Sequence, residues 1–440
     1  MSENQNNMKW WQLSLFGIGS TIGTGFFLAS SLGIKIAGPS ILIGLLFAGL
    51  ATYTVFDALA KMTVKDPQKG AFRIYAQKAF GHWAGFSVGW AYWVCETLIM
   101  GSQLTALSIF TQLWFPKLPL WMLASGYAVL GLLVLLLGNK RLSKAENIFA
   151  VMKIAAILMF IIIGLTFVFG WMGDNVQVNT PSSIGDFFPN GLLGLWSSFI
   201  FAFYAFGGVE VMGLMAIELK DKKEAPKAGS FMVLLLVIIY VVSIGLALLL
   251  VNWDSFNTDK STFVVVLNQF DLNVISNIFN GVLIIAGFST MVASFFGVTT
   301  VLINLAEGKD APAIFAKKGR LAIPLASLGL LIAGLITSIV MSLLLPDKIY
   351  EYITTGAGLM ILYNWFFIIL SATRNLQLKT FDYIKYYVGM ALILLGVSGT
   401  LLDKSNRMGF FISLGFVFVI GVITIVMSRI WKKQGLRETN

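Results

Sequence analysis

Cysteine and histidine each occur only once in this 440-residue chain, as Cys95 and His82. A single cysteine excludes an internal disulfide, a Cys-x-x-Cys metal site and a redox pair. With one histidine and no HExxH, GxSxG or phosphate-binding motif, the sequence offers neither a nucleophile with its base nor a set of metal ligands. We therefore expect a protein that is not an enzyme and that uses no metal or other cofactor.

Charged residues are also scarce. They make up 12% of the chain, against roughly 25% in soluble domains, whereas 57% of the residues are hydrophobic. Many apolar runs approach the roughly 20 residues that span a bilayer. We expect an all-α polytopic membrane protein, a single membrane domain over 1–440, with six helices in 12–218 and six in 229–431. The predicted spans are 12–34, 38–61, 83–112, 119–138, 145–171, 191–218, 229–252, 273–306, 323–345, 350–372, 383–402 and 408–431.

The basic residues are distributed unevenly. The net charge is +10, and most of the 31 lysines and arginines fall in alternate connections between the predicted helices. This asymmetry is the positive-inside pattern, and it predicts a multi-pass protein of the cell membrane with both termini in the cytoplasm. The excess of basic residues is explained by the orientation of the chain in the membrane and does not indicate a nucleic-acid partner. The polar start, MSENQNNMKWW, lacks the features of a cleavable signal peptide.

Two predicted helices contain glycines midway along an apolar span, in GIGSTIGTGFF (17–27) and in FAFYAFGGVE (201–210). They are the first and the sixth, which are matching positions if helices 1 to 5 and 6 to 10 form two halves. Such paired interruptions indicate the midplane binding site of a transporter. A second interpretation is close helix packing, because Gly19 and Gly23 have the GxxxG spacing. A nucleotide-binding loop is disfavoured, since no strand precedes the glycines.

Broken helices expose N–H groups at one helix end and carbonyl groups at the other, and these ends attract an anion and a cation. A free amino acid carries both charges. Gly23 and Gly25 would let a carboxylate approach the backbone closely, and Thr21 and Thr24 would add hydroxyl donors. Aromatic residues border the second break, and we expect Tyr204 to act as a gate.

Ionisable residues inside predicted spans are expensive, which makes them functional candidates. Three of them lie well inside their spans: Lys153 in helix 5, Glu96 in helix 3 and Glu210 in helix 6. Proton exchange is one interpretation for Lys153 and Glu210. The other is structural: a static ammonium that ties helix 5 to carbonyl groups of helix 1 or 8, and a buried carboxylate that anchors helix 6 to the backbone of a neighbouring helix. Asp57 and Lys61, four residues apart on helix 2, predict an ion pair without a transport role.

Several motifs together resemble the amino acid permeases of the amino acid/polyamine/organocation superfamily, most closely the bacterial amino acid transporter branch. They extend over nearly the whole chain: IGTGFFLASS (22–31), AGP (37–39), DPQKGAFRIYAQKAFG with GFSVGWAYW (66–93), AENIFAVMKIAAI (145–157) and FAFYAFGGVEVMG (201–213). The resemblance implies a LeuT-type fold of two inverted five-helix repeats plus two extra helices. It also implies secondary transport of amino acids.

The resemblance assigns roles to individual residues. Thr24 and Gly25 fall where such permeases hold the substrate carboxylate. The ammonium-binding and gating segment corresponds to Phe203, Tyr204 and Gly207, and we add the neighbouring Phe206. For ion coupling, Lys153 matches a lysine that replaces a sodium ion, and Glu210 matches the acid after the second break.

The helix 3 motif departs from the family. A glutamate is common where this chain has Gln103, and Glu96 lies two turns earlier on about the same face. We therefore add Glu96 and its neighbour Cys95 to the predicted substrate-binding residues. A pocket carboxylate would either favour a cationic substrate or take part in proton transfer.

The predicted function is import of a free amino acid by proton-coupled symport through alternating access. The expected substrate is neutral, with a preference for small or hydroxylated side chains such as threonine and serine. An amino acid exchanger and a cationic amino acid permease are alternatives on the same fold. A nontransporting nutrient sensor and a channel are more remote ones, and the oligomeric state stays open.

Overall fold

A computed structural model of the chain describes residues 8–68, 70–136, 139–172, 178–257, 259–317, 319, 323–345 and 348–433, without the side chains of 139–147, 214 and 433. The regular secondary structure of these residues is helical, apart from one isolated β-bridge between Met8 and Leu219. Four basic residues of the positive-inside pattern lie outside the described residues, namely Lys69, Lys318, Arg320 and Arg437, as do the two chain ends predicted to be cytoplasmic.

Two of the predicted spans are broken into shorter helices. They are α1 (Trp10–Thr21), α2 (Thr24–Phe27) and α3 (Ala29–Ala37), and later α10 (Gly191–Tyr204) and α11 (Val209–Met215). The other long helices are α4 (Ile41–Lys65), α6 (His82–Gln112), α7 (Leu120–Leu136), α8 (Asn139–Val168), α12 (Ala225–Leu250), α14 (Asn273–Glu307), α15 (Leu325–Leu344), α16 (Ile349–Asn375), α17 (Thr380–Gly399) and α18 (Lys404–Lys433). The shorter helices are α5 (Ala71–Phe80), α9 (Ile184–Phe187) and α13 (Thr262–Gln269), with 3-10 turns η1 (Gly38–Ser40), η2 (Ala216–Glu218), η3 (Lys222–Glu224), η4 (Trp253–Ser255) and η5 (Ala313–Phe315).

The predicted all-α polytopic architecture is confirmed. Each predicted span corresponds to a helix or to a broken helix, and ten segments of the described chain are long and apolar enough to cross a membrane, with Leu120–Leu136 as a shorter apolar helix. The start of α8 differs, because its helix begins at Asn139 and not near 145. The polar stretch NKRLSKAEN contains neither glycine nor proline, so nothing in it interrupts the helix. The prediction missed α13, which is too short to span.

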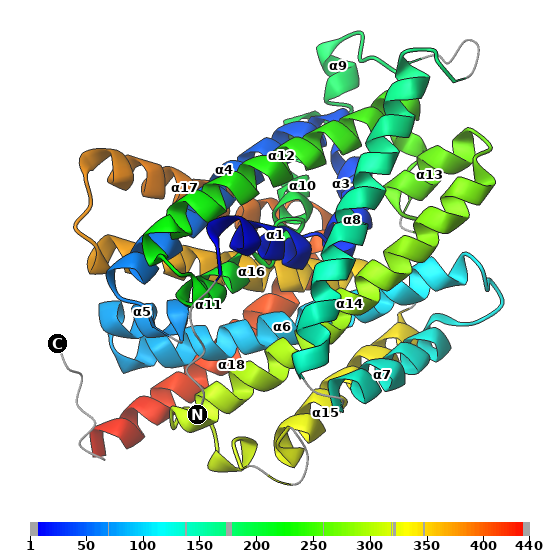
Figure 1. The fold of residues 1–440 in the computed structure, drawn as a ribbon. Helices are drawn as coiled ribbons and strands as arrows, with labels where there is room; N and C mark the ends of the chain where they lie inside the picture. Colours follow the sequence, from blue (N-terminus) through cyan, green and yellow to red (C-terminus); the bar gives the residue numbers. More distant parts are fainter. Residues whose placement is uncertain are drawn as a thin grey trace.

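Helix α6 occupies the middle of the bundle and packs against α14, α16, α5 and α7. Along one side α4 and α12 run next to each other, and α7 pairs with α15 away from them (Figure 1). The close approach of α4 and α12 depends on Gly229, since a Cβ atom there would lie 1.7 Å from the buried ring of Phe56.

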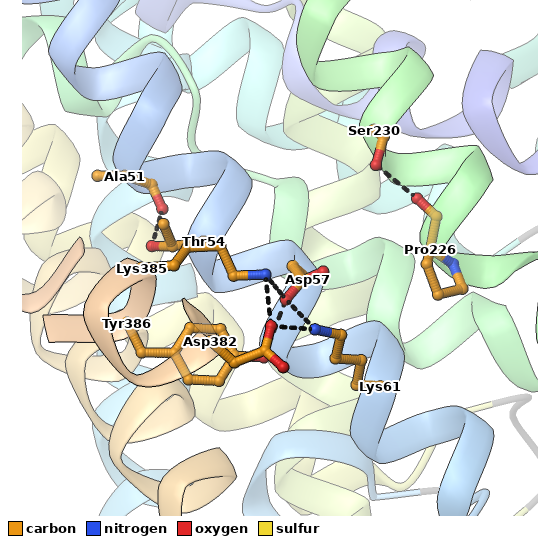
Figure 2. Close-up of polar contacts among 9 residues, drawn as sticks. All are labelled: Ala51, Thr54, Asp57, Lys61, Pro226, Ser230, Asp382, Lys385 and Tyr386. Atoms are coloured by element: carbon orange, nitrogen blue, oxygen red, sulfur yellow. Dashed lines mark hydrogen bonds and ion pairs between the residues drawn. The ribbon is translucent and has the colours of Figure 1, made fainter. Parts of the chain in front are cut away.

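A cluster of four charges joins α4 to α17 (Figure 2). The Asp57 carboxylate accepts from Lys61 at 3.1 Å, from the Tyr386 hydroxyl at 2.9 Å and from Lys385. Asp382 lies 2.7 Å from Lys61 and 3.3 Å from Lys385. The predicted pair of Asp57 and Lys61 is confirmed. Since two ammonium groups balance two carboxylates, the cluster acts as a clamp between the helices.

Both ends of the described chain lie at the same end of the bundle as this clamp. Met8 hydrogen-bonds the backbone next to Leu219, just after α11, and Trp431 packs its ring 4.2 Å from that of His82 at the start of α6. The opposite end carries α9 and α13, in the upper right of Figure 1. We call the first the basic end, after Lys61, Lys65, Arg73, Lys78 and Lys385.

The contact between Gly229 and Phe56 predicts a strong effect of a single methyl group. Replacing Gly229 with alanine should lower the free energy of unfolding by about 1–3 kcal/mol, because overpacking displaces the Phe56 ring. Thermal unfolding in detergent measures this. The control is Gly245→Ala on the same helix, where the nearest atom would be 4.0 Å away. That variant gains the same helix propensity without the clash, so equal melting temperatures for the two variants would contradict the packing argument.

Candidate functional site

The first broken helix opens at Ile22 and Gly23. Both residues are extended, with φ and ψ of −70° and 105° for Ile22 and −149° and −161° for Gly23. Helix α1 therefore ends with free carbonyl groups, and α2 begins at Thr24 with free N–H groups. Among the described residues, none accepts a hydrogen bond from the N–H of Gly23, Thr24 or Gly25. The predicted interruption is confirmed.

The second break lies against the first. Between α10 and α11 the chain turns through Gly208, whose φ of +102° is in the left-handed region that favours glycine. A Cβ atom there would also lie 3.0 Å from the carbonyl oxygen of Ser20 in α1. In the turn before it, no described residue donates a hydrogen bond to the carbonyl oxygens of Phe206 and Gly207. The two opened backbones thus meet inside the bundle.

A cavity of about 500 Å³ lies between the two breaks. From Gly23 and Gly207 it extends to α5 and the last turns of α14, where it is lined by Arg73 and Asn304. It therefore leads from the broken helices to the basic end. The Tyr204 ring, which also lines the cavity, covers the backbone of the first break, because a Cβ atom on Gly25 would lie 3.1 Å from that ring.

The structure brings most of the predicted site residues to this cavity. Those that line it are Thr21, Gly23, Gly25, Glu96, Lys153, Tyr204 and Gly207. The two glycines of the GxxxG pair have different surroundings. A Cβ atom on Gly19 would lie 2.5 Å from that of Ala150 in α8, which is close helix packing. A Cβ atom on Gly23 would lie 3.4 Å from Gln103 and Thr290, and all three of these residues line the cavity.

Other predicted residues do not line the cavity. The Cys95 sulfur lies 3.9 Å from the carbonyl of Ala357, between α6 and α16, because it is turned about 100° around the helix from Glu96. Phe203 and Phe206 point into the core, with ring centroids 6.3 Å from Trp365 and 5.0 Å from Tyr240. Thr24 is fully buried and uses its hydroxyl for Gln103, while Glu210 is buried behind the second break.

Lys153 reaches the first break from α8. Its side chain is buried, and Nζ donates to the Gly19 carbonyl oxygen at 2.9 Å. That carbonyl belongs to the last turn of α1, where the helix dipole favours a cation. The ammonium thus ties α8 to α1 at the edge of the cavity. Both predicted interpretations, an ion-coupling group and a static tie, are compatible with this position.

Glu210 stabilises the second break. Its carboxylate accepts from the Gly208 N–H at 3.2 Å and from the Trp365 indole N–H at 3.1 Å, and the side chain is buried. These donors come from the start of α11 and from α16. The geometry matches the predicted anchor, except that the partner on the neighbouring helix is a side chain and not a backbone group.

Of the described residues that line the cavity, Glu96 is the only one with a carboxylate. It stands on α6 opposite Gly297 of α14, where a Cβ atom would lie 3.0 Å from its Oε2. The glycine makes room for the carboxylate. Because Arg73 and Lys153 also line the cavity, the site combines both signs of charge.

Charges also meet at the mouth of the cavity. The buried carboxylate of Asp310, just after α14, accepts from Arg73 and from His82 Nε2, the latter at 2.7 Å. The Trp90 indole donates to the Asp310 carbonyl at 3.1 Å. Burial lowers the pKa of the Arg73 guanidinium, which nevertheless remains protonated at physiological pH. The lone histidine is therefore part of a structural junction between α5, α6 and the segment after α14.

Sequence reasoning missed several groups that satisfy the opened backbone. The Tyr350 hydroxyl donates to the Thr24 carbonyl at 3.1 Å, and the Tyr240 hydroxyl donates to the Ala205 carbonyl at 2.9 Å. The sequence named Gln103 only as a departure from the family and did not indicate that it accepts from the hydroxyl groups of Thr24 and Thr290. These partners lie far apart along the chain, so no local pattern indicates them. Within the described residues, no group of three or more His, Cys, Asp and Glu residues is placed to hold a metal ion.

A cavity between two broken membrane helices is the architecture of a secondary transporter. The family model described as "Amino acid permease" matches residues 12–435. The chain belongs to the amino acid permease family, so it is a multi-pass membrane transporter of amino acids and not an enzyme. The resemblance seen in the sequence is confirmed.

Individual relatives agree with this family. An "Uncharacterized transporter YcgH" from Bacillus subtilis (strain 168) is 51% identical over 99% of this chain and 97% of that protein. Two proteins named "Aromatic amino acid transport protein AroP" are more distant. The one from Corynebacterium glutamicum is 29% identical over 82% of this chain and 80% of that protein. The one from Escherichia coli (strain K12) is 28% identical over 94% and 92%.

The hydrogen bond between Glu210 and Trp365 predicts energetic coupling. In a double-mutant cycle of Trp365→Phe, Glu210→Gln and the double variant, the coupling energy should be about 0.5–3 kcal/mol. The reason is that removing the indole N–H leaves a buried carboxylate without one of its donors. Thermal or denaturant unfolding in detergent measures each variant, and the volume change at Trp365 cancels in the cycle. Strictly additive effects would show that this contact does not hold the break.

Proposed function

We propose that the protein imports a neutral amino acid across the cell membrane by proton-coupled symport. The observation that carries the proposal is the position of the unpaired backbone groups. Free N–H groups at Gly23, Thr24 and Gly25 and free carbonyl groups at Phe206 and Gly207 belong to two breaks that flank one cavity. An amino acid backbone carries one carboxylate and one ammonium, which match these two sets.

In this proposal the carboxylate binds at the first break and the ammonium at the second. The N–H groups of α2 donate to the carboxylate, and Gly25 allows close approach because it has no side chain. The carbonyl groups of the second break accept from the ammonium. Tyr204, which covers Gly25, separates the bound substrate from the end of the bundle opposite the basic end. These roles preserve the sequence-based assignments for Gly23, Gly25, Tyr204 and Gly207.

Lys153 is the proposed proton carrier. While it is protonated, its ammonium holds the Gly19 carbonyl and so ties α1 to α8. Loss of the proton would remove the charge that pairs with the helix end, and α1 would be free to move. Movement of a broken helix relative to its neighbours is the basis of alternating access in inverted-repeat transporters. The inverted five-helix repeat is likewise proposed, on the match between the two breaks.

The basic end is the proposed cytoplasmic side. Its lysines and arginines follow the positive-inside pattern, and this side carries both ends of the described chain. The cavity leads to this end, so the conformation corresponds to an inward-facing state. Import then requires a second conformation in which the cavity leads past Tyr204.

The substrate side chain is proposed to be uncharged. Ile99, Phe296 and Ile361 line the cavity together with Tyr204, which favours an apolar or small side chain. The sequence-based preference is threonine or serine. The two AroP relatives are named for aromatic amino acids, and the same apolar lining accommodates an aromatic ring. Competition among all twenty amino acids in the transport assay below decides between these side chains.

The coupling is tested in proteoliposomes that contain the purified protein. With an inside-alkaline gradient of about one pH unit, one proton per substrate supports about tenfold accumulation, since one pH unit corresponds to about 1.4 kcal/mol. Lys153→Ala should lose this accumulation and still bind substrate. Lys223→Ala, at an exposed lysine outside the cavity, is the matched control and should accumulate substrate like the wild type. Gradient-independent exchange by both the wild type and Lys153→Ala would make the protein an exchanger and Lys153 a structural tie.

A further inference from the structure

Three polar side chains from three helices meet beside the first break. Gln103 on α6 accepts through Oε1 from the Thr24 hydroxyl of α2 at 2.7 Å and from the Thr290 hydroxyl of α14 at 2.9 Å. All three residues are buried. Within the described chain, the Thr24 hydroxyl has no other acceptor, so its one proton goes to Gln103. This contact determines which way the Gln103 amide is turned.

The orientation leaves the amide nitrogen of Gln103 facing the cavity. Both Gln103 and Gly23 line the cavity, and a Cβ atom on Gly23 would lie 3.4 Å from Nε2. In the described part of the chain no group accepts a hydrogen bond from Nε2. A donor with two hydrogens is therefore presented beside the unpaired N–H of Gly23. Since Gly23 has no side chain, nothing stands between the donor and a ligand at the break.

We infer that the Nε2 amide of Gln103 binds the substrate carboxylate. Gln103 thereby selects ligands with a free carboxylate over the corresponding carboxamides. This inference rests on the proposed function and adds a side-chain donor to the backbone donors of the break. Thr24 and Thr290 act through Gln103 because they hold its carbonyl oxygen away from the ligand.

The chemistry of the amide explains why it suits this position. Nε2 carries hydrogen-bond donors without a net charge, so it strengthens carboxylate binding and adds no unpaired ion to a buried site. A carboxyl group in the same place would have to be protonated in order to donate to the anionic end of the substrate, whereas the amide donates at any pH. The acid on this face of α6 is instead Glu96, seven residues earlier and about 10 Å along the helix. The two positions thus have opposite hydrogen-bonding character, donor at Gln103 and acceptor at Glu96.

The test compares an acid with its amide. Purified full-length protein in detergent is screened by thermal shift against the twenty amino acids, and the strongest ligand is then titrated alongside its carboxamide. For Gln103→Glu, which has nearly the same shape, we expect the Kd of the amino acid to rise about 10- to 100-fold. The Kd of the carboxamide should rise much less, because the carboxamide can itself donate to the glutamate. The ratio of the two affinities should therefore collapse.

Control variants separate this effect from a general disturbance of the helix. Gln112→Glu makes the same chemical change on α6 outside the cavity, and it should keep the wild-type ratio. If Gln103→Glu is not monodisperse, Gln103→Met, which has a similar length but no donor, should also weaken the acid more than the carboxamide. An unchanged ratio in a folded Gln103 variant would overturn the inference and leave the proposed function intact. A wild-type protein that binds none of the amino acids would overturn the proposed function, and this inference with it.

Discussion

The structure depends on how an opened backbone is satisfied inside an apolar bundle. A membrane offers no water to the groups that a broken helix releases, so protein side chains must bind them. Four side chains do so, three from neighbouring helices and one from α11 itself. Lys153 binds the end of α1, Tyr350 binds the carbonyl of the residue that begins α2, Tyr240 binds the turn after α10, and Glu210 receives the N–H that starts α11. Helices α8, α12 and α16 are held around the breaks by these contacts.

The groups that remain unsatisfied define the site. After these four ties are made, N–H groups remain at Gly23 to Gly25 and carbonyl groups at Phe206 and Gly207. They belong to breaks on either side of one cavity, and in the proposed function they bind the carboxylate and the ammonium of an amino acid. The four ties are not equivalent. The two tyrosine contacts are made by neutral hydroxyl groups, whereas the Lys153 contact is made by an ammonium group, which is why we propose Lys153 as the proton carrier.

The sequence is sufficient to predict the helices and the breaks, because apolar length and glycine position are local features. It also predicts that Asp57 pairs with Lys61, which lies one turn away on the same helix. It does not predict that Lys385 completes the cluster, since that residue is more than 300 positions distant. The same limit applies to Gln103. Its importance comes from two threonines on other helices, and only the packing of α2, α6 and α14 brings them together.

The direction in which each side chain points from its helix is the other property that the sequence did not predict. Cys95 and Glu96 are adjacent, yet one packs against α16 and the other lines the cavity. The aromatic residues of the second break divide in the same way, since Tyr204 covers Gly25 while Phe203 and Phe206 pack into the core. A break interrupts the helical period, so the direction of each side chain near it depends on the path of the turn.

The most direct test of the account is a cryo-EM structure of the protein with a saturating amino acid, identified by uptake into proteoliposomes. The account predicts ligand density between the two breaks, with the carboxylate at the N–H groups of Gly23 to Gly25 and the ammonium at the carbonyl groups of Phe206 and Gly207. Density bound elsewhere, for example in the outer depression lined by Lys35 and Glu351, with an empty space between the breaks, would contradict it.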